Sequence, residues 1–322
     1  MATVPLHVAA FEAPEITTIS RGQLLWLTIK RKPLGAASAA LLVVIVLTAL
    51  FAPLLAPYDP LATEPEIRLS APSRAHPFGT DDIGRDVLSR IIYGARISLW
   101  VGLLAVGIGT AAGMVIGLLC GYCEGRVDLI GQRVMDAVQA IPGLVLALAI
   151  VSVLKPNTTN AMIAIALVII PGNSRIVRGA VLSAKQNRYV EAAQAIGCRH
   201  PRIILTHILP NVTAPILVIA SIWLGNAILI EATLSFLGVG TQPPTPSWGL
   251  MLSSTGRAFM EQAPWLAIFP GLAISLAVLA FNLFGDTLRD AWDPKLRRQG
   301  WAARGLLLLQ CDVCEQGFRD CR

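Results

Sequence analysis

Charged and aromatic residues are scarce in this chain. Only 14% of its 322 residues are charged and 6% are aromatic, whereas 54% are hydrophobic and the mean hydropathy is +0.63. So few charges argue against a soluble domain and predict an integral membrane protein. The net charge of +6 is therefore expected to reflect orientation in a membrane lipid bilayer, and we expect no nucleic-acid partner.

Lysine and histidine are also few, which limits the chemistry that the chain could perform. None of the five lysines follows a glycine, so the phosphate-binding pattern G-x-x-x-x-G-K-[S/T] does not occur. The four histidines are scattered and fit no serine-hydrolase or metalloprotease pattern. We expect a chain that is not an enzyme and binds no cofactor, with ATP handled by another chain.

The six cysteines include two C-x-x-C pairs, at 120–123 and 311–314. This spacing holds zinc or forms a redox pair only where the thiols of both pairs converge. Both pairs are expected on the reducing cytoplasmic side of the membrane, and no further motif accompanies them. We therefore expect no metal site.

Long apolar runs occupy most of the chain and predict membrane-spanning helices. A helix needs about 20 apolar residues to cross a bilayer, because it rises about 1.5 Å per residue. Five runs are clear, at 34–56, 97–120, 134–154, 213–237 and 264–285. A sixth, at 161–182, is weaker because polar and helix-breaking residues interrupt it at 171–175. The sequence therefore predicts an all-α integral membrane protein with six transmembrane helices.

The distribution of basic residues predicts the orientation. With six spans, both termini lie on one side of the membrane together with the loops around 121–133 and 175–210. That side holds 19 of the 26 Lys and Arg residues, whereas the opposite side holds seven. Because basic residues accumulate on the cytoplasmic side, the N- and C-termini are expected to be cytoplasmic.

These boundaries divide the chain into three parts. Residues 1–33 are expected to form a cytoplasmic N-terminal segment with an interfacial helix, and residues 34–298 a six-helix transmembrane domain. Within that domain, 57–96 is an external loop and 187–211 a cytoplasmic loop. The tail at 299–322 is expected to be disordered.

Glycine recurs every four residues along the second predicted span, at Gly109, Gly113, Gly117 and Gly121. Such a stripe of small residues allows the backbone of another helix to approach closely. We interpret it as a packing surface.

Glu231 is the strongest candidate for a polar site inside the membrane, because it lies in an apolar part of the fifth predicted span. Ion-coupled transporters place ionisable groups at such positions, so Glu231 could carry a proton or an ion. The alternative is a structural contact within the bundle or a position near the outer interface. The sequence leaves both interpretations open.

The loop at 187–211 reads NRYVEAAQAIGCRHPRIILTHILPN and is too polar to span a membrane. Its first part, 188–196, predicts a short helix with small side chains, which Gly197 can terminate. Pro201 suits the first turn of a second helix. We expect a helix-turn-helix beside the membrane, whose small-residue surface enters a groove on another protein.

This loop resembles the E-A-A…G…L-P motif of binding-protein-dependent ABC importer permeases. The matching residues are Glu191, Ala192, Ala193, Gly197, Leu209 and Pro210. In that family the loop is the coupling helix that sits in a cleft of the ATPase subunit, and the resemblance implies the same role here. His207 departs from the motif, which often has an aliphatic residue at that position.

Three further segments resemble the C-type subunit of the dipeptide and oligopeptide permeases, so that the likeness extends over residues 23–298. They are HPFGTDDIGRDVLSRIIYGARISL at 76–99, GTQPPTPSWGLML at 240–252 and FPGLAISLAVLAFNLFGDTLRDAWDPKLR at 269–297. The resemblance implies a type I ABC importer permease fold in the cytoplasmic (inner) membrane. It also implies a heterodimer with a second permease, two cytoplasmic ATPase subunits and an external solute-binding protein.

The first of these segments contains glycines and charges that allow two interpretations. The residues concerned are Gly79, Thr80, Asp81, Asp82, Gly84, Arg85 and Asp86. In one interpretation the glycines permit tight turns and the charges pair locally in a folded external cap. In the other, the charges contact the docked binding protein or the termini of a zwitterionic peptide.

The resemblance implies the import of dipeptides or oligopeptides, driven by a separate ATPase. Nickel or another small solute carried by the same machinery is the main alternative. Two other classes are an ion-coupled secondary transporter that uses Glu231 and a membrane scaffold whose loop only recruits a partner.

Overall fold

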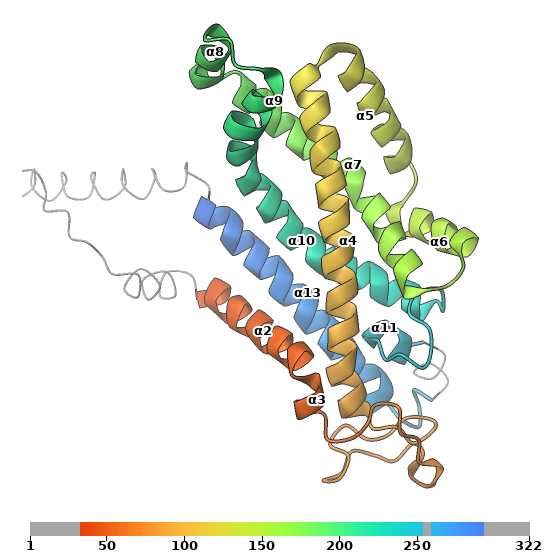
Figure 1. Ribbon diagram of the computed structural model, residues 1–322. Helices are drawn as coiled ribbons and strands as arrows, with labels where there is room; N and C mark the ends of the chain where they lie inside the picture. The colour runs from red at the N-terminus through yellow and green to blue at the C-terminus, as the bar shows by residue number, and fades with distance from the viewer. Residues whose placement is uncertain (1–32, 254–258, 293–322) are drawn as a thin grey trace, which may run out of the picture.

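The computed structural model describes residues 33–253 and 259–292 of the chain. The predicted interfacial helix in 1–33, the tail at 299–322 and the second cysteine pair lie outside these ranges. Within the described residues all regular elements are helical, apart from one isolated bridge between Thr80 and Asp86. Several long helices lie side by side at an angle to one another (Figure 1).

The helices have the following bounds. They are α2 (Pro33–Leu50), α3 (Ala52–Leu55), η1 (Pro65–Ile67), α4 (Val87–Cys123), α5 (Gly125–Gln139), α6 (Gly143–Leu154), α7 (Thr158–Lys185), α8 (Arg188–Ala195), α9 (His200–Arg202), η2 (Ile203–Ile208), α10 (Leu209–Phe236), α11 (Trp248–Met251) and α13 (Trp265–Trp292).

Five helical runs among the described residues are long and apolar enough to cross a membrane. They are Pro33–Leu50, Val87–Cys123, Thr158–Lys185, His200–Phe236 and Trp265–Asp290. The pair α5 and α6 meets the same criteria as a broken span, with a bend of 86° between the two helices. Counting this pair as one span gives the six spans expected from the sequence, and the all-α prediction is confirmed.

The irregular span is not the one that the sequence indicated. The run expected to be weak forms the continuous helix α7, with Pro171 inside it. The run at 134–154, which looked uninterrupted, is instead broken before Pro142, the residue at the start of α6. A proline disfavours helical backbone at the residue before it, here Ile141, which explains the break.

Two of the polar residues that weaken the hydropathy of α7, Asn173 and Ser174, point into the bundle, whereas Arg175 is exposed. Asn173 is buried, and its Nδ2 atom donates a hydrogen bond to Oγ1 of Thr110 on α4, at 2.9 Å. Ser174 is also buried. Because α4 covers this face, the helix keeps its course through a segment that lipid alone would not accommodate.

The glycine stripe of α4 packs against α7, as predicted. A Cβ atom on Gly113 would lie 2.8 Å from Cβ of Asn173, and one on Gly117 would lie 2.5 Å from the carbonyl oxygen of Ser174. Real side chains do not approach this closely, so only glycine permits the observed spacing of the two helices. The stripe therefore sets the spacing between α4 and α7.

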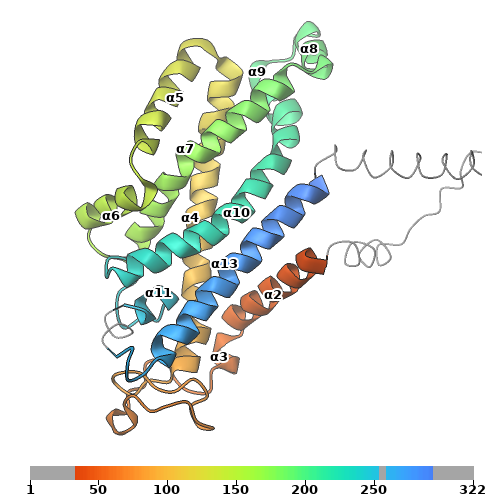
Figure 2. The same cartoon turned by 180° about the vertical axis from the view of Figure 1, so that it is seen from behind.

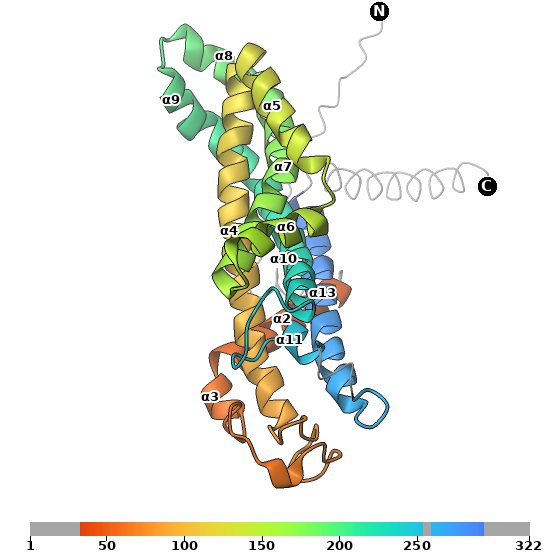
Figure 3. The same ribbon diagram turned by 90° about the vertical axis from the view of Figure 1, so that its right-hand side faces the viewer.

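The bundle has two distinct ends. The loop after α7, which includes α8, lies at one end, and residues 57–86, here called the cap, lie at the other (Figures 1 and 2). A view from the side shows the same two ends, with α8 and α9 far from α3 and the cap (Figure 3). The candidate sites predicted from the sequence are thus divided between opposite ends of the molecule.

Candidate functional site

The loop after α7 begins with the helix α8, and Gly197 terminates this helix. The backbone N–H of Gly197 donates to the carbonyl of Gln194 at 2.9 Å, and that of Cys198 donates to the carbonyl of Ala193 at 3.0 Å. These two bonds form a Schellman motif, which requires a left-handed residue after the helix. Gly197 has φ of +81° and supplies it, so the predicted helix stop is confirmed.

One face of α8 is anchored on the bundle. Val190 and Ala193 are buried in an apolar cluster with Ile203 and Ile208 of η2 and Val181 of α7. The cluster joins α8 to the ends of two membrane-spanning runs.

The opposite face of α8 is open. Glu191, Ala192 and Gly197 are exposed, and Ile196 is 80% exposed although its side chain is apolar. Of the residues matched to the coupling motif, Ala193 points inward and serves the anchoring contact described above. The exposed face of α8 thus combines small and apolar side chains with the polar residues Arg188, Glu191 and Gln194.

The second helix expected in this loop is not separate. Pro201 lies in the first turn of α9, as expected, but α9 continues through the π-helical segment η2 into α10. Together they form one run of 37 residues, His200–Phe236. Leu209 and Pro210 occupy the first turn of α10, and Pro210 has no N–H to donate to the helix ladder. The loop therefore leads straight into a span.

A polar cluster closes the base of the loop. The hydroxyl group of Tyr122, in the last turn of α4, lies 2.6 Å from Nδ1 of His200 in α9. Lys185, the last residue of α7, donates from Nζ to the carbonyl oxygen of Tyr122 and to Oε1 of Glu124, both at 2.9 Å. This cluster joins α4, α7 and α9. Motif reasoning missed it because the partners lie 61 to 78 residues apart.

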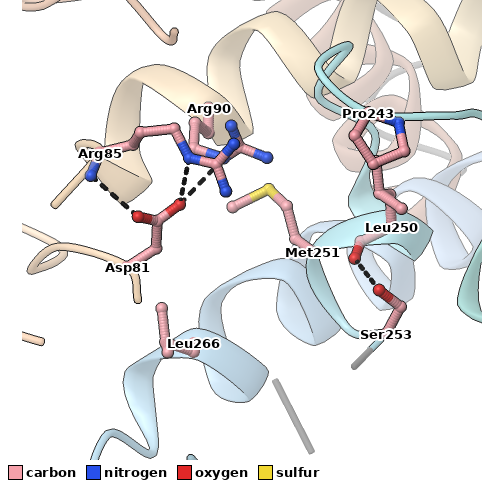
Figure 4. A pocket seen from close by; sticks show the side chains of 8 residues that line it. All are labelled: Asp81, Arg85, Arg90, Pro243, Leu250, Met251, Ser253 and Leu266. Carbon is pink, nitrogen blue, oxygen red and sulfur yellow. Dashed lines mark hydrogen bonds and ion pairs between the residues drawn. The ribbon is translucent and has the colours of Figure 1, made fainter. Parts of the chain in front are cut away.

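At the opposite end, the charges of the cap turn toward one another. Asp81 accepts hydrogen bonds from the backbone N–H groups of Ile83 and Arg85 and from Nε of Arg85, the last at 2.6 Å. Nε of Arg90 in α4 lies 3.7 Å from the same carboxylate. Figure 4 shows this group beside Met251 of α11 and Leu266 of α13, around a cavity of about 100 Å³.

Asp86 fixes the start of α4. Its carboxylate accepts from the backbone N–H of Ser89 at 2.7 Å, which caps the helix, and lies 2.9 Å from Nδ1 of His76. Gly79 and Gly84 have φ of +73° and +83° and form the turns between these charges. This geometry agrees with the first interpretation of the segment, in which the charges pair locally in a folded external cap.

The predicted cap residues differ in exposure. Gly79, Thr80, Asp81, Gly84 and Asp86 are buried, whereas Asp82 and Arg85 are partly exposed. A contact of this segment with a binding protein or a peptide stays a prediction, and in this structure it would have to use the two partly exposed residues.

Glu231 is completely buried near the cap end of α10. Three hydroxyl groups donate to its carboxylate: Ser98 at 3.1 Å, Ser235 at 2.8 Å and Thr241 at 3.2 Å. They come from α4, from α10 and from the segment after α10. The carboxylate therefore links three parts of the bundle, which favours the structural interpretation of this residue over the ion-carrying one.

The described residues contain no group of three or more His, Cys, Asp or Glu side chains that could hold a metal ion. Cys120 is buried and Cys123 is exposed.

The described residues thus form a bundle of candidate membrane-spanning helices with an anchored, exposed loop helix at one end, which is the architecture of an integral membrane protein. Residues 113–298, more than half of the chain, match the binding-protein-dependent transport system inner membrane components. The chain belongs to this family. Residues 20–72 also match the N-terminal transmembrane domain of oligopeptide transport permease C.

Three similar proteins align with 84% to 90% of this chain. The dipeptide transport system permease protein DppC of Alkalihalophilus pseudofirmus is 44% identical over 283 residues, which cover 88% of this chain and 93% of the relative. The probable D,D-dipeptide transport system permease protein DdpC of Escherichia coli is 43% identical over 289 residues, covering 90% and 96%. The glutathione transport system permease protein GsiD of Escherichia coli is 45% identical over 273 residues, covering 84% and 90%.

A solved structure shows the same fold. A chain of the MetNI methionine ABC transporter, in an inward-facing conformation, superposes with a TM-score of 0.53 and 15% sequence identity. The superposition covers 64% of this chain and 98% of the other. This match confirms the predicted permease fold, and the family matches and relatives given above confirm the predicted family.

Proposed function

We propose that this chain is a permease subunit of an ABC importer that moves dipeptides or oligopeptides across the cytoplasmic membrane. The observation that carries the proposal is α8, which is anchored on two spans by Val190 and Ala193 and leaves the face around Glu191 open. The relatives described above are named as peptide permeases, which supports the substrate class.

The energy comes from a partner. Two ATPase subunits dock on the α8 end, and this chain supplies no ATPase site of its own, since its sequence has no phosphate-binding loop of the G-x-x-x-x-G-K-[S/T] form. A second, related permease completes the pore as a heterodimer, and an external solute-binding protein delivers the solute at the cap end.

The distribution of charge supports this assignment of sides. Exposed arginines surround the α8 end, namely Arg126, Arg188, Arg199 and Arg202. The cap end carries the exposed acids Asp59, Glu64 and Glu66 beside two exposed arginines, Arg68 and Arg74. By the positive-inside rule the α8 end and both termini face the cytoplasm.

The mechanism is a two-state movement biased by ATP on another chain. When ATP closes the ATPase pair, α8 is drawn with it, and the apolar cluster around Val190 passes this motion to α7 and α10. The Tyr122–His200 contact passes it to α4. Movement of these spans then opens the pore toward the outside.

Co-purification tests the docking surface. The chain is isolated from detergent-solubilised membranes as wild type and as the double variant Glu191→Lys, Gly197→Trp, and the accompanying proteins are identified. We expect an ATPase and a second permease with the wild type, and loss of the ATPase alone from the variant. Glu66→Lys is the matched control, because it makes the same charge change on an exposed residue of the cap. Absence of any ATPase from the wild-type preparation would contradict the proposal.

The energy source and the cargo are tested by uptake into cells. Vanadate should abolish uptake of a labelled dipeptide, whereas a protonophore should leave it unchanged. The reverse result would favour an ion-coupled transporter acting through Glu231. Retained uptake in cells without this chain would favour a scaffold, and competition by nickel but not by peptides would favour a metal or small-solute importer.

A further inference from the structure

A charged groove of about 480 Å³ lies between α5 and α7. This volume falls in the range of small-molecule sites, about 300–1,000 Å³. Its lining residues are Asp128, Leu129, Gln132, Arg133 and Asp136 of α5 and Arg175 and Arg178 of α7. The groove is separate from the coupling loop, from the cap and from Glu231.

Two ion pairs cross the groove like the rungs of a ladder. Arg178 holds Asp128 through Nε and Nη2, both at 2.5 Å, and Nη2 of Arg175 lies 2.7 Å from Oδ1 of Asp136. Positions 128, 132 and 136 recur every four residues, so they share one face of α5. Gln132 therefore lies between the two rungs.

The groove keeps hydrogen-bond donors and positive charge after these pairs are made. Nε2 of Gln132 is buried and has no hydrogen-bond partner among the described residues. Arg133 lines the same groove. Three arginines against two aspartates leave the lining with a charge of +1. A buried amide donor without an acceptor costs free energy, which an anionic ligand would recover.

The exposed charges of the groove argue against lipid tails as its normal surroundings. Both helices that form it belong to candidate membrane spans, and the side chains of Arg175 and Asp136 are 53% and 47% exposed in the single chain. Charges within a span face water or protein because exposure to hydrocarbon is costly. The groove therefore opens toward a water-filled path or a partner chain.

We propose that this groove is a binding site for the C-terminal carboxylate of the transported peptide, with Gln132 and Arg133 as the hydrogen-bond donors. The inference rests on the peptide-importing function proposed above. A carboxylate accepts hydrogen bonds from an amide and a guanidinium at once and neutralises the excess charge of the groove. The two ion-pair rungs keep α5 and α7 at the distance that leaves room for it.

The test compares two solutes that differ only at this group, alanyl-alanine and its C-terminal amide. The complete importer, with its ATPase and binding protein, is reconstituted into liposomes, and the uptake rates of both solutes are measured. Because the same binding protein delivers both, a change in the ratio of the two rates between variants reports on the permease. The variants are Gln132→Leu and Arg133→Gln, with Arg133→Lys as the conservative one.

Two matched variants control for general effects on α5. Gln139→Leu and Arg126→Gln make the same changes at exposed positions of the helix that do not line the groove. We expect the preference for the free carboxylate to fall about tenfold in Gln132→Leu and in Arg133→Gln, the effect of losing one hydrogen bond to a charged group. The preference should stay at the wild-type level in Arg133→Lys and in both controls.

An unchanged ratio in Gln132→Leu and Arg133→Gln would overturn the inference while leaving the peptide importer intact. Loss of the second permease from the purified variant complexes would also overturn it, because the groove would then be an interface between permeases. If the wild-type importer took up neither solute, the proposed function itself would fail, and the proposed carboxylate-binding site would fail with it.

Discussion

The hydroxyl group of Tyr122 lies 2.6 Å from Nδ1 of His200, which joins the last turn of α4 to the first residue of α9. The two rings meet edge to face, with centroids 5.6 Å apart, and the ammonium group of Lys185 lies 5.4 Å from the centre of the tyrosine ring. This side chain of α4 thus contacts the end of α7 and the start of α9, on either side of the coupling loop. It is well placed to pass movement of that loop to α4, the helix that packs most closely on α7.

Replacing Tyr122 with Phe tests this connection. The change removes only the hydroxyl group, whose hydrogen bond is worth about 1 kcal/mol, so the amount of peptide carried per ATP hydrolysed should fall about fivefold. ATP hydrolysis should continue, because α8 keeps its apolar anchor. Uptake and phosphate release are measured together in liposomes. Tyr93→Phe, near the other end of α4, is the control, and an unchanged ratio in Tyr122→Phe would show that the contact transmits nothing.

Gly197 offers a test of the backbone at the end of α8. A Cβ atom here would meet nothing within 4 Å, so substitution costs only the left-handed conformation at φ of +81°. For alanine that cost is about 1–2 kcal/mol, and for asparagine it is smaller. We expect Gly197→Ala to weaken binding of the ATPase and Gly197→Asn to weaken it less, in a titration of purified ATPase into the permease. Equal losses in both variants would mean that any side chain at this position interferes with binding, whatever its backbone preference.

Local patterns predicted what depends on neighbours in the sequence. The apolar runs gave the spans, and the four-residue spacing of Gly113 and Gly117 predicted a helix contact that α7 makes. Gly197 likewise marked the end of α8, because the left-handed cap is a property of a few consecutive residues. These features need no knowledge of the rest of the fold.

Features that depend on distant partners were not predictable in the same way. Pro171 looked like a break, yet α4 covers that face of α7, whereas Pro142 breaks its span. Ala193 belonged to the matched motif on sequence, but its position in the apolar cluster turns it away from the partner face. No sequence pattern singled out Tyr122, because its role depends on the contact with His200, which is distant in the sequence.

Because α4 packs closely on α7, substitutions at two glycines of α4 should differ greatly in the stability that they cost. A valine at Gly117 would place Cβ 2.5 Å from the carbonyl oxygen of Ser174, and backbone cannot yield as a side chain can. We expect a loss of about 3 kcal/mol or more, because overpacking a tight core typically costs 1–3 kcal/mol. Gly107→Ala is the control, since nothing lies within 4 Å of its Cβ position. Thermal unfolding in detergent measures both, and equal transition temperatures would contradict the packing role.

Two substitutions at Glu231 distinguish a structural role from ion transport. They differ in whether the surrounding hydroxyl groups keep a hydrogen-bond acceptor. Glutamine keeps the size of the side chain and one oxygen that Ser235 and Thr241 can use, whereas leucine leaves the donors without an acceptor. If the carboxylate only links the bundle, Glu231→Leu should lower stability by about 1–3 kcal/mol per stranded group, and Glu231→Gln should remain close to wild type in stability and in ATP-driven uptake. If Glu231 carried a proton or an ion, Glu231→Gln would abolish uptake without loss of stability, because the amide does not ionise. Unfolding temperature and peptide uptake, measured on the same two variants, therefore decide between a fixed contact of α4 with α10 and a carrier of charge.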